Sequence, residues 1–383
     1  MKKRILSLML IAAMTMSLTA CGSSADAKAE AETTAKAAET TEKAAENTAE
    51  TEAADDELEL EQTTIKWAKD SSGNCFLGIA LEKGWFEEVG LKIEEVPIDN
   101  SVDAVSALAA GQVDIISNYG TCYPLSSIGT GEDIQIIGGY MATGCIPIVA
   151  KEGAEWNGVE SLVGKKIASM KNQYVLTREL MEAGYEPFED VEWLEYSGAS
   201  DRLAAVAKGE ADYGVLSTSR NYEASQTEGI EVVGYMSDIW DWYSCCRMCV
   251  MGDYLEENPN TVKTIMKVLL RAQSWYEASE ENKEETIDIM VDYMGVTREF
   301  LESYMKNDHM KISVDPLKNT VVEAWDVLLE TDSLPEGSEN INIEDYIKEE
   351  VYREALDMAI EEYYDEAPEF YDKMVEFYDE HNK

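Results

Sequence analysis

The stretch Asp103-Ala-Val-Ser-Ala-Leu-Ala-Ala-Gly111-Gln-Val-Asp114-Ile recurs later in the chain as Asp201-Arg-Leu-Ala-Ala-Val-Ala-Lys-Gly209-Glu-Ala-Asp212-Tyr. The offset is constant at 98 residues, from 103 to 201, from 111 to 209 and from 114 to 212. A repeat of this length exceeds the units that stack in solenoid proteins. The repeat therefore predicts two related α/β lobes, and two such lobes usually face each other across a cleft.

Each copy of the repeat predicts the element order β-α-β-α-β. In the first copy we expect strands at 64–68, 91–96 and 113–117, and helices at 76–83 and 103–110. In the second copy we expect strands at 166–169, 191–194 and 211–216, and helices at 174–183 and 201–208. Glycines such as Gly84 and Gly111 end these helices, because a residue without a Cβ accepts a left-handed backbone. This order predicts a parallel sheet with right-handed crossovers in each lobe.

Polar residues follow the carboxyl ends of all six predicted strands. Ligands of open α/β sheets bind beyond these ends, close to helix N-termini. Strand-end loops are polar in many proteins, so a single residue carries little weight and the clustering across six loops carries more. The candidate ligand-binding residues from these loops are Ser72, Asn74, Asn118, Tyr119, Thr121, Asn172, Gln173, Ser217 and Arg220.

The N-terminus has the pattern of a secretory signal. Lys2-Lys3-Arg4 is basic, and the apolar stretch from Ile5 to Leu18 is too short to span a bilayer comfortably. Leu18-Thr-Ala-Cys21 resembles the bacterial lipobox, which implies removal of residues 1–20 and lipidation of Cys21. Acyl chains bury about 0.8 kcal/mol per methylene, so a multiply acylated cysteine would anchor the protein to a membrane. An ordinary signal peptide with a chance cysteine is the alternative.

Residues 21–62 are expected to form a disordered or partly helical tether. They consist largely of Ala, Glu, Thr, Lys and Ser and contain no aromatic residue, so they cannot build a core. The formal net charge of the whole chain is −46. This charge argues against nucleic acid as a partner, because phosphates would be repelled. It does not exclude a small anionic ligand, because charges beyond about 10 Å are screened.

The cysteines and histidines do not predict a metal site or a catalytic residue. Residues 242–251 are expected to form a strand, on which Cys246 and Cys249 point to opposite faces. Cys245 and Cys249 would share a face about 13 Å apart, too far for one ion. With only His309 and His381 in the chain, both expected at the surface, ligands for zinc are scarce. We therefore expect buried thiols, with no metal, no cofactor and no catalytic residue, and leave disulfide pairing open.

One family resembles this chain over roughly residues 63–330. The motifs are Leu77-Gly-Ile-Ala-Leu-Glu-Lys-Gly-Trp-Phe-Glu-Glu-Val-Gly-Leu91, then Ala107-Leu-Ala-Ala-Gly-Gln-Val-Asp-Ile115, then Leu162-Val-Gly-Lys-Lys-Ile-Ala168. They resemble ABC-importer solute-binding proteins for nitrate, sulfonates, taurine and thiamine-pyrimidine precursors. The resemblance implies a type II periplasmic-binding-protein fold, with two α/β lobes, each a mixed sheet flanked by helices.

The resemblance also implies the domain limits. Lobe one would be 63–146 together with 247–383, and lobe two would be 147–246. The hinge crossings would lie near 144–149 and 245–250, beside two further candidate ligand-binding residues, Thr143 and Arg247. A ligand would bind between the lobes, and the closed form would dock on a membrane permease.

Within the family, Cys245-Cys246-Arg247 resembles a cysteine run in the branch that includes eukaryotic thiamine-pyrimidine synthases. This favours an aromatic heterocycle as ligand, on which Trp240, Trp242 or Tyr243 could stack. Alternatively, Arg220 or Arg247 could bind a sulfonate or carboxylate in bidentate fashion. Core packing for the aromatic residues and structural ion pairs for the arginines are the competing interpretations.

The C-terminal part is expected to be helical. Asn258-Pro259 opens a long helix, with Asn as N-cap and Pro at the first position. Helices are predicted at 259–278, 283–293, 298–306, 318–331 and 342–362. A last amphipathic helix, with Phe370, Tyr371, Met374, Val375 and Tyr378 on one face, is expected to cap lobe one.

Together these features predict an extracytoplasmic, lipid-anchored binding protein, expected to be monomeric, that delivers a small nutrient to an ABC permease. A ligand sensor for a membrane kinase is the first alternative. A pyrimidine-synthase-like enzyme is the second.

Overall fold

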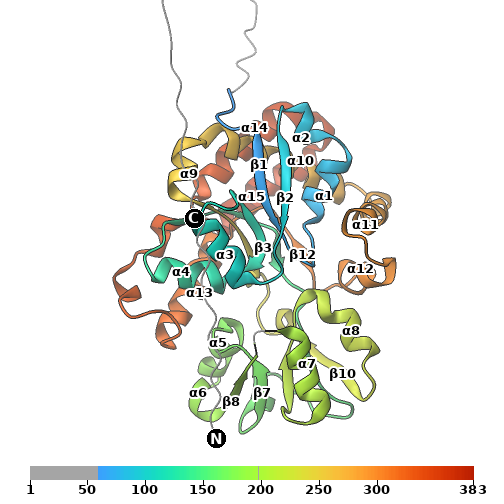
Figure 1. Ribbon diagram of the computed structural model, residues 1–383, viewed down its shortest axis with the longest axis vertical. Helices are drawn as coiled ribbons and strands as arrows, with labels where there is room; N and C mark the ends of the chain where they lie inside the picture. The colour runs from blue at the N-terminus through green and yellow to red at the C-terminus, as the bar shows by residue number, and fades with distance from the viewer. Residues whose placement is uncertain (1–58, 197) are drawn as a thin grey trace, which may run out of the picture. The chain divides into compact units, whose positions relative to one another are not determined.

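Two lobes, one above the other in Figure 1, organise the described part of the chain. The upper lobe contains a two-stranded and a three-stranded sheet, and the lower lobe contains a five-stranded sheet. The computed structural model describes residues 59–196 and 198–383. The predicted signal peptide, Cys21 and residues 21–58 of the predicted tether lie outside these residues. Everything described belongs to one compact unit, Glu57–Lys383.

Lobe one is built on β1, β2, β3, β4 and β11. These strands span Thr64–Lys69, Lys92–Pro97, Ile116–Gly120, Ile134–Gly139 and Cys246–Met251. β1 pairs with β2 in parallel, and a parallel bridge from Trp67 to Ile115 joins β1 to the chain entering β3. β11 lies between β3 and β4 and is antiparallel to both. The strand order across lobe one is therefore β2-β1-β3-β11-β4.

Lobe two repeats this plan. Its strands β6 to β10 span Pro147–Lys151, Lys166–Ser169, Glu192–Glu195, Tyr213–Val215 and Ile230–Tyr235. The strand order is β8-β7-β9-β6-β10, with β7 parallel to β8 and β9, and β6 antiparallel to β9 and β10. The parallel arrangement predicted for the three strands of each repeat copy is correct, and so is the mixed sheet that the family resemblance implies. One strand in each lobe, β11 and β6, runs against the others, because the chain crosses between the lobes there and enters the sheet in the reverse direction.

The predicted helices of the repeat form within three residues of their expected starts. Lobe one has α1, α2, α3 and α4 at Cys75–Glu82, Trp85–Glu88, Ser101–Ala109 and Cys122–Gly129. Lobe two has α5, α6, α7 and α8 at Tyr174–Glu182, Pro187–Asp190, Ala199–Lys208 and Asn221–Gln226. Gly84 follows α1 with φ 73° and Gly209 follows α7 with φ 76°, the left-handed conformation expected at these ends.

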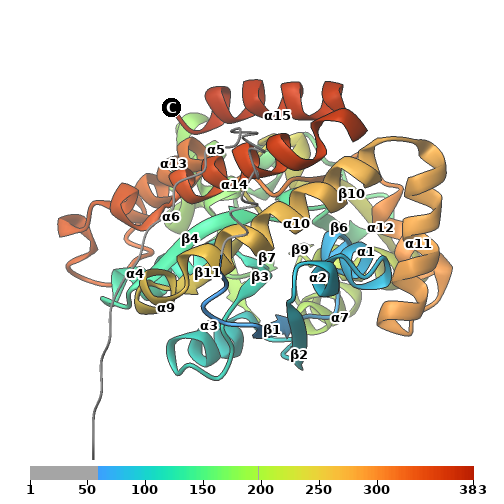
Figure 2. The ribbon, with the colours of Figure 1, turned by 90° about the horizontal axis from the view of Figure 1, so that it is seen from above.

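Seven helices follow β11. They are α9 to α15, at Gly252–Glu257, Pro259–Glu277, Glu280–Met294, Arg298–Met305, Lys318–Glu330, Glu349–Tyr363 and Pro368–His381. α10 packs against α1 and α14, and α14 also contacts β4. α15 packs on α14 and α10 and forms the outermost layer in Figure 2, as expected for a cap on lobe one. Its residues Phe370, Tyr371, Met374 and Tyr378 are buried.

The helix predicted at 342–362 begins later than expected. Ile347 forms a parallel bridge with Ile136 at the edge of β4, and residues 343–346 form a 3-10 turn. Because the backbone of Ile347 is extended in this bridge, α14 begins only at Glu349.

The strand predicted at 242–251 is also shorter than expected. Trp242 and Ser244 adopt left-handed backbone conformations, with φ of 55° and 54°. Left-handed residues do not fit a pleated strand, so β11 begins at Cys246. β5, Met141–Thr143, and β12, Lys311–Ile312, form a small antiparallel pair next to this segment.

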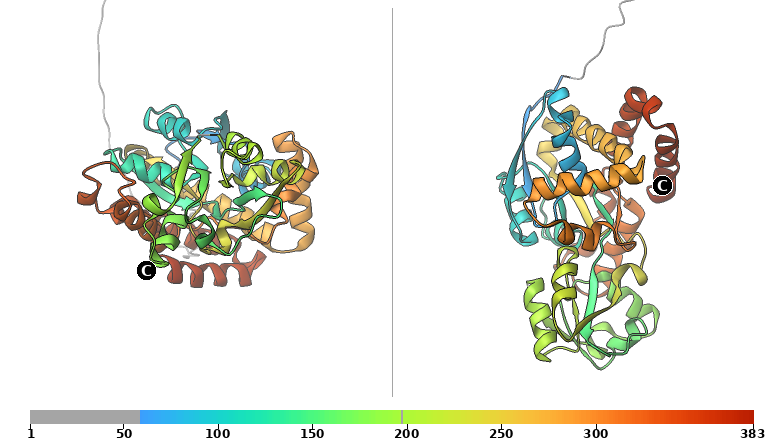
Figure 3. Two further views of the ribbon diagram at one scale, coloured as in Figure 1. Left: turned by 90° about the horizontal axis from the view of Figure 1, so that it is seen from below. Right: turned by 90° about the vertical axis from the view of Figure 1, so that its right-hand side faces the viewer.

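The two lobes touch on both sides of their connection. α5 of lobe two contacts α13 of lobe one, where Arg178 Nε lies 2.7 Å from Glu323 Oε1. On the other side α8 contacts α12, where Tyr222 and Phe300 meet edge to face. Figure 3 shows the lobes from the side, with the dark-red C-terminal helices against lobe one and away from the green lobe two. Among residues 59–196 and 198–383, no helix combines the length and apolar character needed to cross a membrane.

Candidate functional site

A cavity of about 390 Å³ lies where the two lobes face each other. The loops after β1, β2 and β3 line it from lobe one, and the loops after β7, β8 and β9 line it from lobe two. The volume is within the range of about 300–1,000 Å³ that small-molecule sites occupy. All six strand-end loops of the repeat therefore meet at one place.

The lobe-one wall contains a half-buried carboxylate. Asp70 Oδ1 accepts hydrogen bonds from Gly73 N at 3.0 Å and from Asn118 Nδ2 at 2.9 Å. Burial raises the pKa of Asp70 to about 6, although these hydrogen bonds oppose the increase. Within the described residues Asp70 forms no ion pair, so its charge has no protein counter-ion there.

Asn118 and Tyr119 lie beside this carboxylate. The Asn118 side chain is 7% exposed, and its Oδ1 is buried without a hydrogen-bond partner. The Tyr119 hydroxyl donates to Ile98 O at 2.6 Å. Burial raises the pKa of Tyr119 far above its usual range, and the nearby carboxylates Asp70 and Asp99 add to this effect. Asn118 Oδ1 therefore remains available to accept a hydrogen bond from a ligand.

The lobe-two wall carries two arginines. Arg202 is 6% exposed and donates from Nε to Tyr196 O at 2.9 Å and from Nη1 to Val215 O at 3.1 Å. Burial lowers the pKa of Arg202, but a guanidinium keeps its charge at any physiological pH. Arg220 is more exposed, and its Nη1 lies 3.2 Å from Glu223 Oε2 in a surface ion pair.

The helices that start at the cavity differ between the lobes. In lobe one, the Asn74 and Asn100 side chains accept hydrogen bonds from first-turn amides of α1 and α3. In lobe two, α5 after Gln173 and α7 after Gly198 have no side-chain cap. In α5, Tyr174 N and Leu176 N already donate to Asn172 O and Gln173 O, and the first turn of α7 contains the acidic residue Asp201. The helix dipole at both starts favours negative charge.

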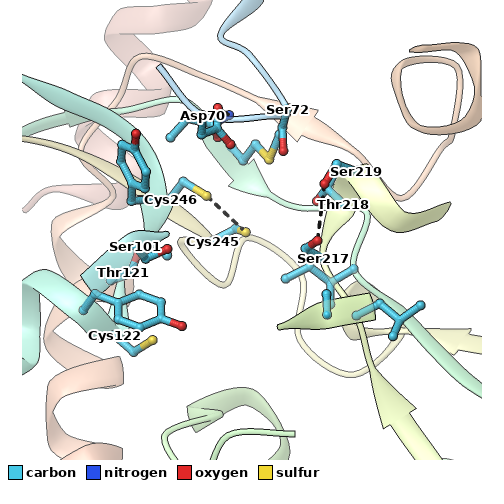
Figure 4. Close-up of a pocket in the computed structure, with 18 of the residues that line it drawn as sticks. Asp70, Ser72, Ser101, Thr121, Cys122, Ser217, Thr218, Ser219, Cys245 and Cys246 are labelled. Atoms are coloured by element: carbon cyan, nitrogen blue, oxygen red, sulfur yellow. Dashed lines mark hydrogen bonds between the residues drawn. The ribbon is translucent and has the colours of Figure 1, made fainter. Parts of the chain in front are cut away.

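Hydroxyl groups and thiols complete the lining. In Figure 4, Ser217, Thr218 and Ser219 of lobe two lie across the pocket from Ser101, Thr121 and Cys122 of lobe one. The sulfurs of Cys245 and Cys246 lie 3.5 Å apart at the start of β11 (Figure 4). Burial raises the pKa of Cys122 to about 12, so its thiol stays protonated and is a poor nucleophile at neutral pH.

The structure places eight of the predicted residues along this cavity. They are Ser72, Asn118, Tyr119, Thr121, Asn172, Gln173, Ser217 and Arg220. Two of them also hold the fold together, because Thr121 N donates to Cys245 O at 2.9 Å and the Thr121 hydroxyl donates to Ser244 O. Contact of these eight residues with a ligand stays a prediction.

Three predicted ligand-binding residues do not line the cavity. Asn74 is buried, and its Oδ1 caps α1 by accepting from Phe76 N at 3.0 Å. Thr143 is fully buried, and its Oγ1 accepts from Trp242 N at 3.0 Å. Arg247 is fully buried in β11 and donates to three backbone carbonyls, those of Asp315, Pro316 and Met141. All three side chains are occupied by backbone groups of the protein itself.

The aromatic residues proposed to stack on a ligand are also mostly elsewhere. Trp240 packs against Tyr174 and under the guanidinium of Arg178, and Trp242 packs against Phe377 in the C-terminal cap. Of the three candidates only Tyr243 lines the cavity. Its hydroxyl is hydrogen bonded to Gly144 N and O, so it belongs to the connection between the lobes.

The two histidines, predicted to lie at the surface, are half-buried and do not line the cavity. His309 stacks on Tyr235 with ring centroids 4.0 Å apart, and its Nδ1 lies 2.8 Å from Ser237 Oγ. His381 packs against Phe377 with centroids 4.1 Å apart. His309 therefore lies where the chain packs against lobe two.

The loop sequences did not single out Asp70 and Arg202, two charged residues that line the cavity. Asp70 stands in the polar run that follows the first strand, yet a residue near Gly73 is expected to be a turn residue. Arg202 had a clearer signal. The repeat places it at the position of Ala104, so a guanidinium replaces a methyl group on the buried face of the equivalent helix.

Among the described residues, no group of three or more His, Cys, Asp or Glu side chains could hold a metal ion. The six cysteines of this part of the chain are buried free thiols. The cavity therefore offers hydrogen-bonding groups and charges, and binding of a polar small molecule is the chemistry that it supports directly.

Comparisons with known proteins agree with this geometry. The model of the family described as NMT1/THI5 like matches residues 75–283, more than half of the chain. A candidate binding protein of Brucella abortus (strain 2308) is 25% identical over 270 residues, which cover 67% of this chain and 79% of that protein.

Three solved structures have the same fold. The periplasmic aliphatic sulphonate binding protein SsuA from Escherichia coli superposes with a TM-score of 0.62 at 19% identity, covering 76% of this chain and 99% of SsuA. The periplasmic nitrate-binding protein NrtA from Synechocystis PCC 6803 superposes with a TM-score of 0.64 at 17% identity, covering 78% of this chain and 89% of NrtA. The desulfurization enzyme DSZB superposes with a TM-score of 0.54 at 13% identity, covering 78% of this chain and 99% of DSZB. The chain therefore belongs to the NMT1/THI5-like family and has the fold of the periplasmic binding proteins.

Proposed function

We propose that this protein is an extracytoplasmic solute-binding lipoprotein that captures a small nutrient between its lobes and delivers it to an ABC importer. The observation that carries the proposal is the cavity of about 390 Å³, to which all six strand-end loops of the repeat contribute. Family membership and the fold shared with SsuA and NrtA support it.

The proposed ligands are a sulfonate, taurine, nitrate or a thiamine-pyrimidine-like heterocycle. Polar groups from both lobes would bind it, chiefly Asn118, Asn172, Gln173 and the hydroxyls of 217–219. The tyrosines that line the cavity, Tyr119, Tyr123, Tyr174 and Tyr243, could contact a flat ring. The placement of Trp240 and Trp242 outside the cavity removes part of the support for a heterocycle.

Binding would favour a closed arrangement of lobe one, 63–146 with 247–383, on lobe two, 147–246. The chain crosses between the lobes next to Gly144 and just before Cys246, where Trp242 and Ser244 have left-handed backbones. A ligand that touches both walls would stabilise the closed state only as far as it binds that state more tightly than an open one. The closed form would then be the one that docks on the permease.

The anchor and location follow from residues outside the described range. Cys21 would carry the lipid, and the tether would hold the binding domain away from the extracytoplasmic face of the membrane as a monomer. Labelling cells with a palmitate analogue tests this: the wild-type chain should be labelled and the Cys21→Ser variant should not. Equal labelling of both chains would refute the anchor and leave the binding function untouched.

A thermal-shift screen of the full-length chain in detergent tests the binding function. The panel would contain nitrate, taurine, short alkanesulfonates, aminomethyl- and hydroxymethyl-pyrimidines and flavins. A ligand at 100 times its Kd should add about 2.7 kcal/mol to the free energy of unfolding and raise the Tm by some degrees. A hit that loses its effect in the Asn118→Ala variant would support the cavity as the site. No hit, together with no small molecule released on denaturing the purified chain, would contradict the proposal.

An enzyme is the second candidate function. The observation that favours it is the fold shared with the desulfurization enzyme DSZB. The protonated thiol of Cys122 disfavours this residue as a nucleophile, whereas the hydrogen bond with Cys246 lowers the pKa of Cys245, which also lines the cavity. Incubation with pyridoxal phosphate, followed by mass spectrometry of the products, separates the two candidates. Product formation that is lost when Asn118 or Arg202 is replaced would favour the enzyme.

A further inference from the structure

The charged side chains that line the cavity are separated by lobe. From lobe one come two carboxylates, Asp70 and Asp99, and from lobe two come two guanidinium groups, Arg202 and Arg220. The described part of lobe one contributes no Lys, Arg or His to the lining, and that of lobe two contributes no Asp or Glu. The site is therefore negative on one wall and positive on the other.

The hydrogen-bonding groups are divided in the same way. On lobe one, Asn118 Oδ1 is buried without a partner next to the Asp70 carboxylate, so two acceptors face the cavity together. The amides that start α1 and α3 on this wall are already capped by Asn74 and Asn100. Lobe one therefore offers acceptors to a ligand and has lost part of its donors to internal caps.

Lobe two offers mainly donors. The first turns of α5 and α7 have no side-chain cap, and both helices begin at the cavity. The buried guanidinium of Arg202 and the hydroxyls of Ser217, Thr218 and Ser219 lie on the same wall. Uncapped helix starts, a guanidinium and hydroxyls together make a site for an oxyanion.

A ligand with a single charge would use only half of this site. A simple anion would be held by lobe two, but closure would bring it towards the uncompensated carboxylate of Asp70, which opposes binding. A simple cation would meet Asp70 and be repelled by Arg202. A molecule that carries both charges at opposite ends would place an ammonium group beside Asp70 and an acidic group beside Arg202.

We propose that the ligand is a small zwitterion, such as an aminosulfonate or an ω-amino acid. Its ammonium group binds Asp70 and Asn118 Oδ1 on lobe one, and its acidic group binds Arg202 and the starts of α5 and α7 on lobe two. This inference rests on the proposed solute-binding function and narrows the ligand class for the same cavity. It also gives closure a cause, because only the closed cleft brings both charged walls to one small molecule.

The direct test compares matched ligands on the full-length chain in detergent by isothermal titration calorimetry. Taurine would be compared with ethanesulfonate, which lacks the ammonium, and with ethylamine, which lacks the sulfonate. A second series would contain γ-aminobutyrate, butyrate and butylamine. A screen of the protein amino acids and betaines would extend the range of zwitterions tested. We expect at least one zwitterion to bind, with each single-charge analogue at least tenfold weaker.

The Asp70→Asn variant adds a test that a structural role would not pass. The amide keeps the shape and one acceptor oxygen but removes the charge. The substitution should lower the affinity for the zwitterion at least tenfold. The affinity for its anionic analogue should stay equal or increase, so the preference for the zwitterion disappears. Asp292→Asn, at an exposed position of α11, is the matched control and should change neither affinity. Circular dichroism would check that both variants fold.

The possible failures are distinguishable. If anions or heterocycles bind as tightly as zwitterions, the zwitterion inference is wrong and the binding function stands. The same holds if Asp70→Asn weakens the zwitterion and the anion equally. If no compound of any class binds and the purified chain releases no small molecule, the proposed function fails and the inference fails with it. Should the variant not fold, the analogue series on the wild-type chain still decides.

Discussion

The substitution Arg247→Met tests whether this buried arginine holds the fold together or binds a ligand. Arg247 is fully buried in β11, and its guanidinium donates to Asp315 O at 3.0 Å, Pro316 O at 2.8 Å and Met141 O at 3.1 Å. These bonds connect the strand that returns from lobe two with the segment before α13 and with β5. Methionine keeps much of the apolar volume, so the change mainly removes hydrogen bonds.

The expected loss can be worked from these contacts. Leaving a buried acceptor without its donor costs about 1–3 kcal/mol, and three carbonyls lose theirs. Because the guanidinium charge leaves as well, its own desolvation cost disappears and offsets part of the loss. We expect the free energy of unfolding to fall by about 3–5 kcal/mol, which changes the unfolding equilibrium roughly a hundredfold to a few thousandfold.

Urea denaturation followed by circular dichroism measures this change. With a slope of about 3 kcal/mol per M, the midpoint should fall by about 1–1.7 M while the slope stays the same. Arg353→Met is the control, because Arg353 forms an exposed i,i+4 pair with Asp357 and should lose less than about 1 kcal/mol. A loss below 1 kcal/mol at Arg247, with ligand affinity abolished, would refute this reasoning and restore Arg247 as a ligand-binding residue.

Three further predictions concern the connection between the lobes and the cavity. In Gly144→Ala the new Cβ would lie 2.5 Å from Cys245 Sγ, so the Tm should fall. Adding Cys245→Ala should recover much of the lost Tm, and no recovery would mean that the clash is elsewhere. Arg178→Ala removes the ion pair with Glu323 that joins the lobes and should change ligand affinity by less than about fivefold. The effect should become smaller at high salt, and an effect independent of salt would contradict an electrostatic role. The pKa of Asp70 is raised in the folded state from 3.8 to about 6, so between about pH 4 and 6 the folded chain holds a proton on Asp70 that the unfolded chain has lost. Its ionisation therefore lowers stability as the pH rises through this window, and Asp70→Asn should flatten the Tm profile there; an unchanged profile would show that Asp70 does not titrate in this window.

The repeat made much of the fold predictable. The constant offset of the repeat and helix-ending glycines such as Gly84 are local signals, and they located the parallel strands and their helices. The strand β6 was not predicted, and β11 was predicted as a strand without its partners, because the pairing of both depends on where the chain returns from the other lobe. No local pattern near Cys245 indicates that Trp242 and Ser244 take left-handed backbones.

The cavity was predictable as a set of loops and much less as individual side chains. Asn74 and Arg247 have residue types that bind ligands, yet the backbone of the protein uses them first, one as a helix cap and one as a donor to three carbonyls. Which acceptor an Asn or Arg reaches depends on tertiary distances that spacing does not contain. Arg202 was the exception, because the mismatch with Ala104 in the repeat marked it within the sequence itself.

The interruption of lobe one by lobe two has a consequence for how the chain acquires its structure. All five strands of lobe two lie in one continuous segment, from Pro147 to Tyr235. The sheet of lobe one is incomplete until β11 arrives at Cys246, and α14 covers it only from Glu349 onward. Because closing long loops slows folding, lobe two should be the first to gain protection from hydrogen exchange as the chain refolds. A polypeptide that emerges from its N-terminus would then hold β1, β2 and β3 without β11 until residue 246 appears, and without the cover of α14 until residue 349 appears.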